Sequence, residues 1–208
     1  MKKLIYAFLF VTFSTGLFSQ ESIVLNKPDL TRGFNVMKAL QLRASATKYD
    51  TKMLSLQDLS DLCWAANGIN RPESGKKTAP SAINAQDIDV YVAMEQGIYF
   101  YDAKESVLKL VANGDNRKLL AGRQANVASA PVILLLVSDL SRFRMGEKET
   151  KMIWAAEDAG IVSQNISIFC SGTGMVTRCR AFMEKDQLKT LLKLNDNQIL
   201  MLNHPVSY

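Results

Sequence analysis

The segment from residue 152 to residue 170 carries apolar and small side chains at helical spacing on almost every side. This pattern predicts one long, largely buried helix. The helix should end in residues 171–174, because the glycines there readily adopt the left-handed conformation that closes helices. Small side chains also recur along one line of the helix, at Ala156, Gly160, Ser163, Ser167 and Cys170. A second helix backbone, from this chain or from another subunit, could approach closely along that line.

Two shorter helices are predicted earlier in the chain. Asp29 is a suitable N-cap for the first, which should end near residues 43–49. Its apolar positions fall on one side at helical spacing, at Leu30, Phe34, Met37 and Leu40. The second helix should begin at Ser55, with Asp58 placed as in a capping box, and end at Gly68. Residues 67–80 then have the glycine and proline content of a long loop.

Apolar runs in the middle of the chain predict a β-sheet. Residues 89–94, 97–101 and 107–111 favour an antiparallel meander. Residues 131–137 are apolar throughout, which is typical of a central strand covered on both faces. Shorter helices are predicted at 116–125 and 185–194, and further strands at 176–182 and 198–202. This order predicts an α+β fold, with a layer of helices on a mostly antiparallel central sheet and the long helix at its centre.

The first twenty residues differ in composition from the rest. Lys2 and Lys3 precede an uncharged apolar run over residues 4–18, and small polar residues follow at Ser19 and Gln20. This arrangement is typical of a secretory signal peptide, and the run is shorter than the ~20 residues of a membrane-spanning helix. We therefore expect a signal peptide at 1–20, one domain at 21–208, and a periplasmic or secreted protein.

Charge, cysteine and histidine content exclude several classes of function. The formal net charge of +5 falls to +3 without Lys2 and Lys3, and the remaining basic residues are scattered among acidic ones, so no nucleic-acid binding is expected. The three cysteines form no C-x-x-C pair, so no metal site is predicted, and Cys63 and Cys170 should simply pack in the core. The single histidine, His204, is expected at the surface or at a strand end, without a Ser-His-Asp arrangement.

Three segments resemble one family in the correct order. Residues 78–86, Thr-Ala-Pro-Ser-Ala-Ile-Asn-Ala-Gln, resemble the P-S-x-x-N-x-Q segment of the nitroreductase-like flavoproteins. Residues 56–72 are similar to a helix of the branch related to azoline dehydrogenases, and residues 157–175 resemble the family's central helix and its glycine-rich end. The resemblance covers roughly residues 40–205. It implies the nitroreductase-like fold.

The resemblance also implies a cofactor and a partner. It implies a homodimer with FMN at each subunit interface, in which electrons pass from a reduced nicotinamide, NAD(P)H, through the flavin to a small acceptor such as a nitro compound or a quinone. Arg43 and Ser45 match the family's phosphate-binding segment, and Thr47 stands where a second cation usually does, so Lys48 would have to supply that second charge. The residues matched to the flavin ring are Pro80, Ser81, Ala82, Asn84 and Gln86, and Arg180 and Ala181 match positions beside the ring's reactive nitrogen.

Two alternatives remain open at this point. Ser81, Asn84 and Gln86 also suit a plain turn that leads into a strand. The whole chain could likewise be a secreted protein that binds flavin or another planar ligand without turnover. Azole formation is not expected, because Arg144 and Met145 stand where the azoline-oxidising members have a Lys-Tyr pair.

Overall fold

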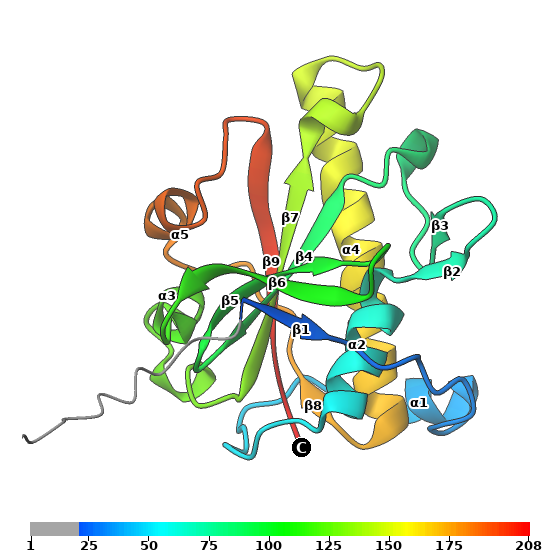
Figure 1. Cartoon of the computed structure of the whole chain (residues 1–208), viewed down its shortest axis with the longest axis vertical. Coiled ribbons are helices and arrows are strands. Elements are labelled where there is room, and N and C mark those ends of the chain that lie inside the picture. Colours follow the sequence, from blue (N-terminus) through cyan, green and yellow to red (C-terminus); the bar gives the residue numbers. More distant parts are fainter. Residues whose placement is uncertain (1–20) are drawn as a thin grey trace, which may run out of the picture.

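The computed structural model describes residues 21–208, which form a seven-stranded sheet surrounded by helices (Figure 1). The predicted signal peptide lies outside the described residues. The sheet has the order β1-β6-β5-β4-β7-β9-β8, and every neighbouring pair of strands is antiparallel. Its strands are β1 (Ser22–Val24), β4 (Ile88–Met94), β5 (Gly97–Asp102), β6 (Val107–Asn113), β7 (Val132–Asp139), β8 (Val176–Thr177) and β9 (Gln198–Ser207). The predicted α+β fold with a mostly antiparallel sheet is confirmed.

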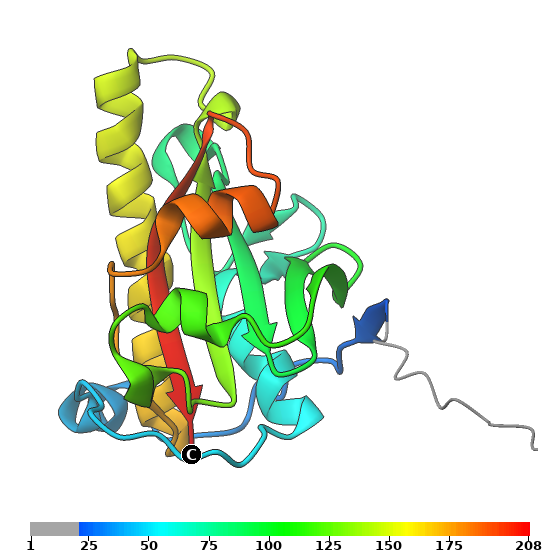
Figure 2. The same cartoon turned by 90° about the vertical axis from the view of Figure 1, so that its left-hand side faces the viewer.

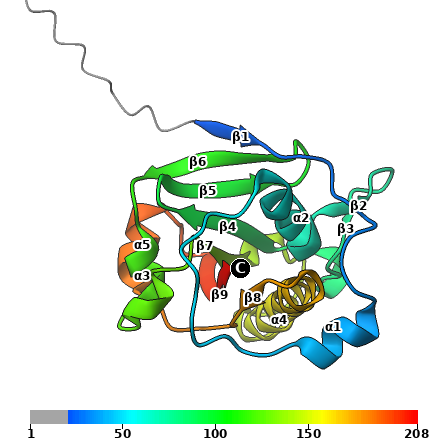
Figure 3. The ribbon, with the colours of Figure 1, turned by 90° about the horizontal axis from the view of Figure 1, so that it is seen from below.

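Helices cover both faces of this sheet, rather than forming the single layer predicted (Figure 3). The helices are α1 (Val36–Leu42), α2 (Leu56–Asn67), α3 (Arg117–Ala121), α4 (Lys148–Thr173) and α5 (Lys185–Leu191). On β7, Leu134 and Leu136 belong to the core beneath α2 and α4, whereas Ile133 and Leu135 belong to the core beneath α3 and α5. Consecutive side chains of a strand point to opposite faces, so the unbroken apolar run of β7 follows from its two covered faces.

The helix boundaries agree with the sequence for α2 and α4 but not for α1. The Ser55 side chain accepts the amide N–H of Asp58 and α2 ends at Gly68, as predicted. Helix α1 begins only at Val36, with Asn35 as its N-cap. Asp29 instead accepts the N–H and hydroxyl of Thr31 in a local turn. The apolar side of α1 is exposed and only Ala39 is buried, because α1 contacts α4 through this small residue.

Helix α4 is the long helix that the sequence predicts, and it is buried along one side. It ends at Gly174, which has φ 80°. Its buried side includes Ala155, Ala159, Val162, Ile166 and Cys170. On its other side Ile153, Gly160 and Ile161 are exposed, and a Cβ added to Gly160 would meet no atom within 4 Å. The line of small residues is therefore open along part of its length.

Smaller differences concern the loop and the last strands. The predicted loop 67–80 contains a hairpin of β2 (Ile69–Arg71) and β3 (Lys76–Lys77). The extended stretch predicted at 176–182 is a strand over only two residues, whereas β9 runs five residues beyond its predicted end at 202. Cys63 and Cys170 are buried with free thiols, as expected. Among residues 21–208, no helix is both long and apolar enough to cross a bilayer.

Candidate functional site

The turn before β4 has an unusual backbone. Ile83, Asn84 and Gln86 have positive φ angles of 48°, 56° and 49°. Asparagine tolerates this left-handed region, but a β-branched isoleucine does so only at a cost of roughly 1–2 kcal/mol. Such strain persists only where the surrounding structure imposes it, and it is typical of binding and catalytic segments. These backbone angles distinguish the turn from an ordinary turn that leads into a strand, and they make it a candidate binding segment.

Two side chains from other elements and one backbone carbonyl of the hairpin hold the turn in this conformation. Asp158 of α4 accepts the Ala82 N–H with both carboxylate oxygens, at 3.0 Å each. Arg142, which follows β7, donates to the Gln86 carbonyl at 2.9 Å and forms an ion pair with Asp89 at 2.7 Å. The Gln86 side chain donates to the Gly75 carbonyl of the hairpin. Ile83 and Asn84 are left exposed at the tip of the turn.

The predicted phosphate-binding residues lie in the exposed extended stretch after α1. Arg43, Ser45 and Thr47 are all exposed, and Ser45 pairs with Thr177 of β8. The Ala46 N–H donates to the Thr177 carbonyl at 2.9 Å. A cavity of about 240 Å³ adjoins this stretch, lined by Phe34, Leu42, Ala44, Ser45, Ala46, Ser167, Cys170, Ser171, Gly174, Met175, Val176 and Thr177.

One protomer does not bring these two groups of residues together. The turn is fastened to Asp158, whereas the stretch leading into α1 is fastened to the C-terminal end of α4 by a bond from the Phe34 N–H to the Gly172 carbonyl. These two points on α4 are fourteen residues apart, which corresponds to about 21 Å along a helix. Figures 1 and 2 show α1 beside one end of α4 and the turn at residues 82–84 beside the other half.

Arg180 has a structural role that the sequence did not suggest. Its side chain is buried and donates to Gln124 Oε1, to Asn203 Oδ1, and to the carbonyls of Leu120 and Ala121 at the end of α3. Its guanidinium is thus engaged with protein oxygens, which does not support the predicted role beside a flavin. Ala181 is exposed, and its role stays a prediction.

His204 is fully buried, so the prediction of a surface or strand-end position is wrong. The reason is that β9 continues through it beneath α4. Its Nε2 lies 2.8 Å from Ser163 Oγ and its Nδ1 lies 3.2 Å from Thr177 Oγ1. Burial lowers the pKa of His204 to about 3, so the ring is neutral near pH 7. It supports the stretch that contains Ser45 indirectly, because Thr177 also pairs with Ser45.

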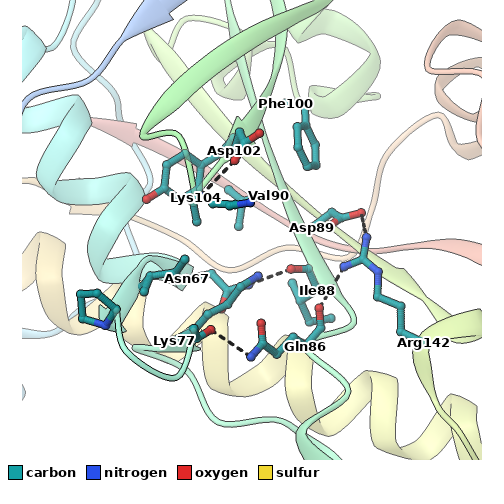
Figure 4. Close-up of a pocket in the computed structure, with 15 residues that line it drawn as sticks. Asn67, Lys77, Gln86, Ile88, Asp89, Val90, Phe100, Asp102, Lys104 and Arg142 are labelled. Carbon is teal, nitrogen blue, oxygen red and sulfur yellow. Dashed lines mark hydrogen bonds and ion pairs between the residues drawn. The ribbon is translucent and has the colours of Figure 1, made fainter.

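A cavity of about 510 Å³ lies between the hairpin and the strands β4 and β5 (Figure 4). Gln86 forms part of its wall, so it adjoins the strained turn. Lys77, Lys104 and Arg142 bring positive charge to it, and Asp89 and Asp102 bring negative charge. The sequence predicts a loop at residues 67–80, whereas the hairpin formed there closes this cavity, so the cavity does not follow from the sequence. Among residues 21–208, no cluster of His, Cys, Asp and Glu could hold a metal ion.

The sequence and the fold have clear counterparts among known proteins. The model of the Nitroreductase family matches residues 40–206. A Methanocaldococcus jannaschii protein described as a nitroreductase is 24% identical over 191 residues, which cover 88% of this chain and 96% of that protein. A crystal structure described as a nitroreductase of Ralstonia eutropha is 33% identical, with a TM-score of 0.85, and the match covers 91% of this chain and 90% of that one.

A more distant structure shares the fold. It is named as an NAD(P)H:FMN oxidoreductase of Staphylococcus epidermidis, has a TM-score of 0.64 at 11% identity, and the match covers 87% of this chain and 90% of that one. Residues 40–206, which the family model matches, include the long helix, the strained turn and the stretch after α1. The family predicted from the three sequence segments is confirmed, and its branch stays a prediction. The chain belongs to the nitroreductase family.

Proposed function

We propose that this protein is an exported FMN-dependent oxidoreductase that passes electrons from a reduced donor to a small acceptor. The observation that carries the proposal is the left-handed turn at Ile83 and Asn84, held by Asp158 and Arg142. The resemblance to the family implies that a flavin ring would border this turn. The Staphylococcus epidermidis relative, named as an NAD(P)H:FMN oxidoreductase, supports both the cofactor and the reaction class. When bound, FMN would accept electrons from the donor and deliver them to the acceptor.

The residues after α1 fit the phosphate group of FMN. Arg43 is exposed and takes part in no ion pair within residues 21–208, so its guanidinium is free to bind an anion. Ser45 adds a hydroxyl beside the 240 Å³ cavity. An arginine and a hydroxyl at alternate positions can both reach phosphate oxygens. Thr47 adds no charge, so Arg43 carries most of the electrostatic attraction.

The residues of the turn fit the ring end of the cofactor. The Pro80–Asn84 backbone is held rigidly, so it can border a flat ring without losing conformational entropy on binding. Asn84 is exposed at the tip and offers an amide to the polar edge of the ring. Gln86 donates to the Gly75 carbonyl and forms part of the wall of the 510 Å³ cavity, so we assign it a supporting role.

A homodimer would allow one flavin to contact both the turn at residues 80–86 and the stretch that contains Arg43 and Ser45. About 21 Å of α4 lies between the turn and the phosphate-binding stretch, so one flavin can contact both only if one group comes from a second copy. Exposed apolar side chains in two regions also support an interface, because exposed apolar patches often mark contact surfaces. They lie on and before α1 and on the outer side of α4, at Leu30, Phe34, Val36, Met37, Leu40, Leu42, Ile153 and Ile161.

The test begins with the purified protein and FMN. We expect FMN to bind with quenched fluorescence, to be bleached by a chemical reductant or by NAD(P)H, and to regain its colour when a nitroaromatic compound or a quinone is added. The Asn84→Ala variant should bind FMN more weakly. Binding and bleaching without reoxidation by any acceptor would instead favour the non-catalytic flavin-binding protein. Absence of FMN binding would overturn the proposal.

A further inference from the structure

Asp158 holds the flavin-facing turn through a single amide. Its side chain is buried, and both of its oxygens accept the Ala82 N–H. Hydrogen bonds from an N–H to a carboxylate are stronger than those between neutral groups. Asp158 lies on the long helix α4, so the position of Ala82 depends on this one side chain.

A second buried carboxyl group lies next to it. Asp87 is 0% exposed, and its Oδ2 accepts the hydroxyl of Ser138. Its Oδ1 is the only buried side-chain nitrogen or oxygen without a hydrogen-bond partner within residues 21–208. Asp87 and Asp158 are close enough for their carboxyl groups to hydrogen-bond. A proton on Asp87 Oδ1 would give this oxygen a partner and would avoid two adjacent buried negative charges.

In the described part of the chain, no positively charged side chain is bonded to Asp87 in place of that proton. Arg142 is near Asp87, but its guanidinium is bonded to Asp89 and to the Gln86 carbonyl. Lys77 of the hairpin also contributes positive charge at longer range, and burial lowers its pKa. Asp89 and Asp139 add negative charge around Arg142. Asp87 therefore has a charged neighbour of its own sign and no directly bonded cation.

We propose that Asp158 is a positioning residue for the flavin-binding turn, and that one proton shared with Asp87 keeps it in place. The part of this inference that concerns flavin rests on the proposed function. Burial, and then the hydrogen bond and charge of Asp158, raise the pKa of Asp87 to about 7. Below that pH the shared proton is present and Ala82 is held. Above that pH the two carboxylates repel each other. The turn, rather than helix α4, should then move, and the bond to the Ala82 N–H should weaken.

The first experiment needs no flavin. Amide hydrogen exchange at Ala82 is measured by NMR between pH 6 and 8.5 and corrected for the intrinsic pH dependence of exchange. In the unsubstituted protein, protection should fall roughly tenfold across this range as one hydrogen bond weakens. Asp87→Asn keeps a donor on the neighbour of Asp158 without a titrating proton, so its protection should stay flat. Asp158→Ala should lose protection at every pH.

A matched control and clear contrary results complete this experiment. Glu157→Gln removes an exposed carboxylate next to Asp158 and should behave like the unsubstituted protein. The inference is overturned if Asp87→Asn shows the same pH dependence as the unsubstituted protein. Equal protection in Asp158→Ala and the unsubstituted protein would also overturn it. If Asp158→Ala does not fold, the inference is still tested by comparing the pH dependence of Ala82 protection in Asp87→Asn and in the unsubstituted protein.

The second experiment links the pair to the cofactor. FMN affinity of the unsubstituted protein should fall above about pH 7, and Asp87→Asn should remove this dependence. If FMN affinity depends on pH in the same way in Asp87→Asn and in the unsubstituted protein, then Asp87 and Asp158 do not position the flavin-binding turn through a shared proton. If no variant binds FMN at all, the proposed function fails, while the exchange profile of Ala82 still decides whether the two aspartates share a proton.

Discussion

Arg43 and Asn84 carry the two ends of the proposed cofactor site, and single substitutions should separate them. Arg43→Ala removes a charge-assisted contact worth roughly 1.5–3 kcal/mol, so FMN should bind roughly tenfold to over a hundredfold more weakly. Riboflavin, which lacks the phosphate, should bind as before. A fluorescence titration with both flavins measures this, and Lys185→Ala, which removes an exposed charge from α5, serves as the control. Equal FMN affinity in Arg43→Ala would remove the phosphate assignment.

His204 makes a prediction about acid stability. Its pKa in the fold, about 3, is below its ordinary value of 6.5, so the unfolded chain binds a proton more readily. This contribution to stability is fully present above about pH 6.5 and is lost as the pH falls toward 3. His204→Leu should weaken that pH dependence. At pH 7 it should also cost about 1–3 kcal/mol, because the hydroxyls of Ser163 and Thr177 lose a partner.

Denaturant unfolding at several pH values tests both statements. Asp87 contributes with the opposite sign, because its raised pKa favours the folded state at low pH and this contribution is lost between about pH 4 and 7. Asp87→Asn therefore provides the comparison curve. An unchanged slope between pH 3 and 6.5 in His204→Leu would contradict the role assigned to the buried imidazole.

At the scale of elements, the strained turn makes its own prediction. Ile83 is half exposed at φ 48°, so Ile83→Asn loses little burial and relieves the unfavourable conformation. The free energy of unfolding should rise by roughly 0.5–1 kcal/mol, as measured by denaturant titration. Ile153→Asn replaces an exposed isoleucine of ordinary helical conformation and should give no such gain. A loss of stability in Ile83→Asn would mean that the isoleucine makes contacts that outweigh its strain.

Helix α4 makes a prediction about association. A side chain at Gly160 meets open space in one protomer, so Gly160→Leu should leave the protomer folded. In the proposed dimer it should overpack the interface and cost about 1–3 kcal/mol of association free energy. Sedimentation velocity measures the effect, and Gly160→Ala, which also favours helix by about 1 kcal/mol, is the small control. If Gly160→Leu forms the dimer as readily as the unsubstituted protein, the interface does not include Gly160.

The elements most fully predicted from sequence are those whose local signals agree with their packing. Ser55 and Gly68 define α2 because capping depends on neighbouring residues alone. The start of α1 was placed too early because Leu30 and Phe34 have helical spacing but no core to face. Asp87 and His204 could not be assigned from sequence, since their roles come from Asp158, Ser163 and Thr177, which are distant along the chain.

At the scale of the whole molecule, the family, the sheet and the long helix followed from sequence, whereas the second layer of helices and the cavity behind the hairpin did not. The export prediction is tested by the native protein itself. We expect its N-terminus near Glu21, because the basic and apolar character of residues 1–20 is typical of a cleaved signal. Mass spectrometry of protein from its own cell envelope would show this. Finding Met1 intact there would contradict it.

The two anchoring points on α4 also constrain how this protein can change over time. Inserting or deleting one residue between Asp158 and Gly172 would turn one end of the helix by about 100° relative to the other and move it about 1.5 Å. The bond from the Ala82 N–H to Asp158 and the bond from the Phe34 N–H to the Gly172 carbonyl could then no longer form at the same time. Homologues that share the proposed cofactor site should therefore tolerate length variation in the β2–β3 hairpin but not in this part of α4.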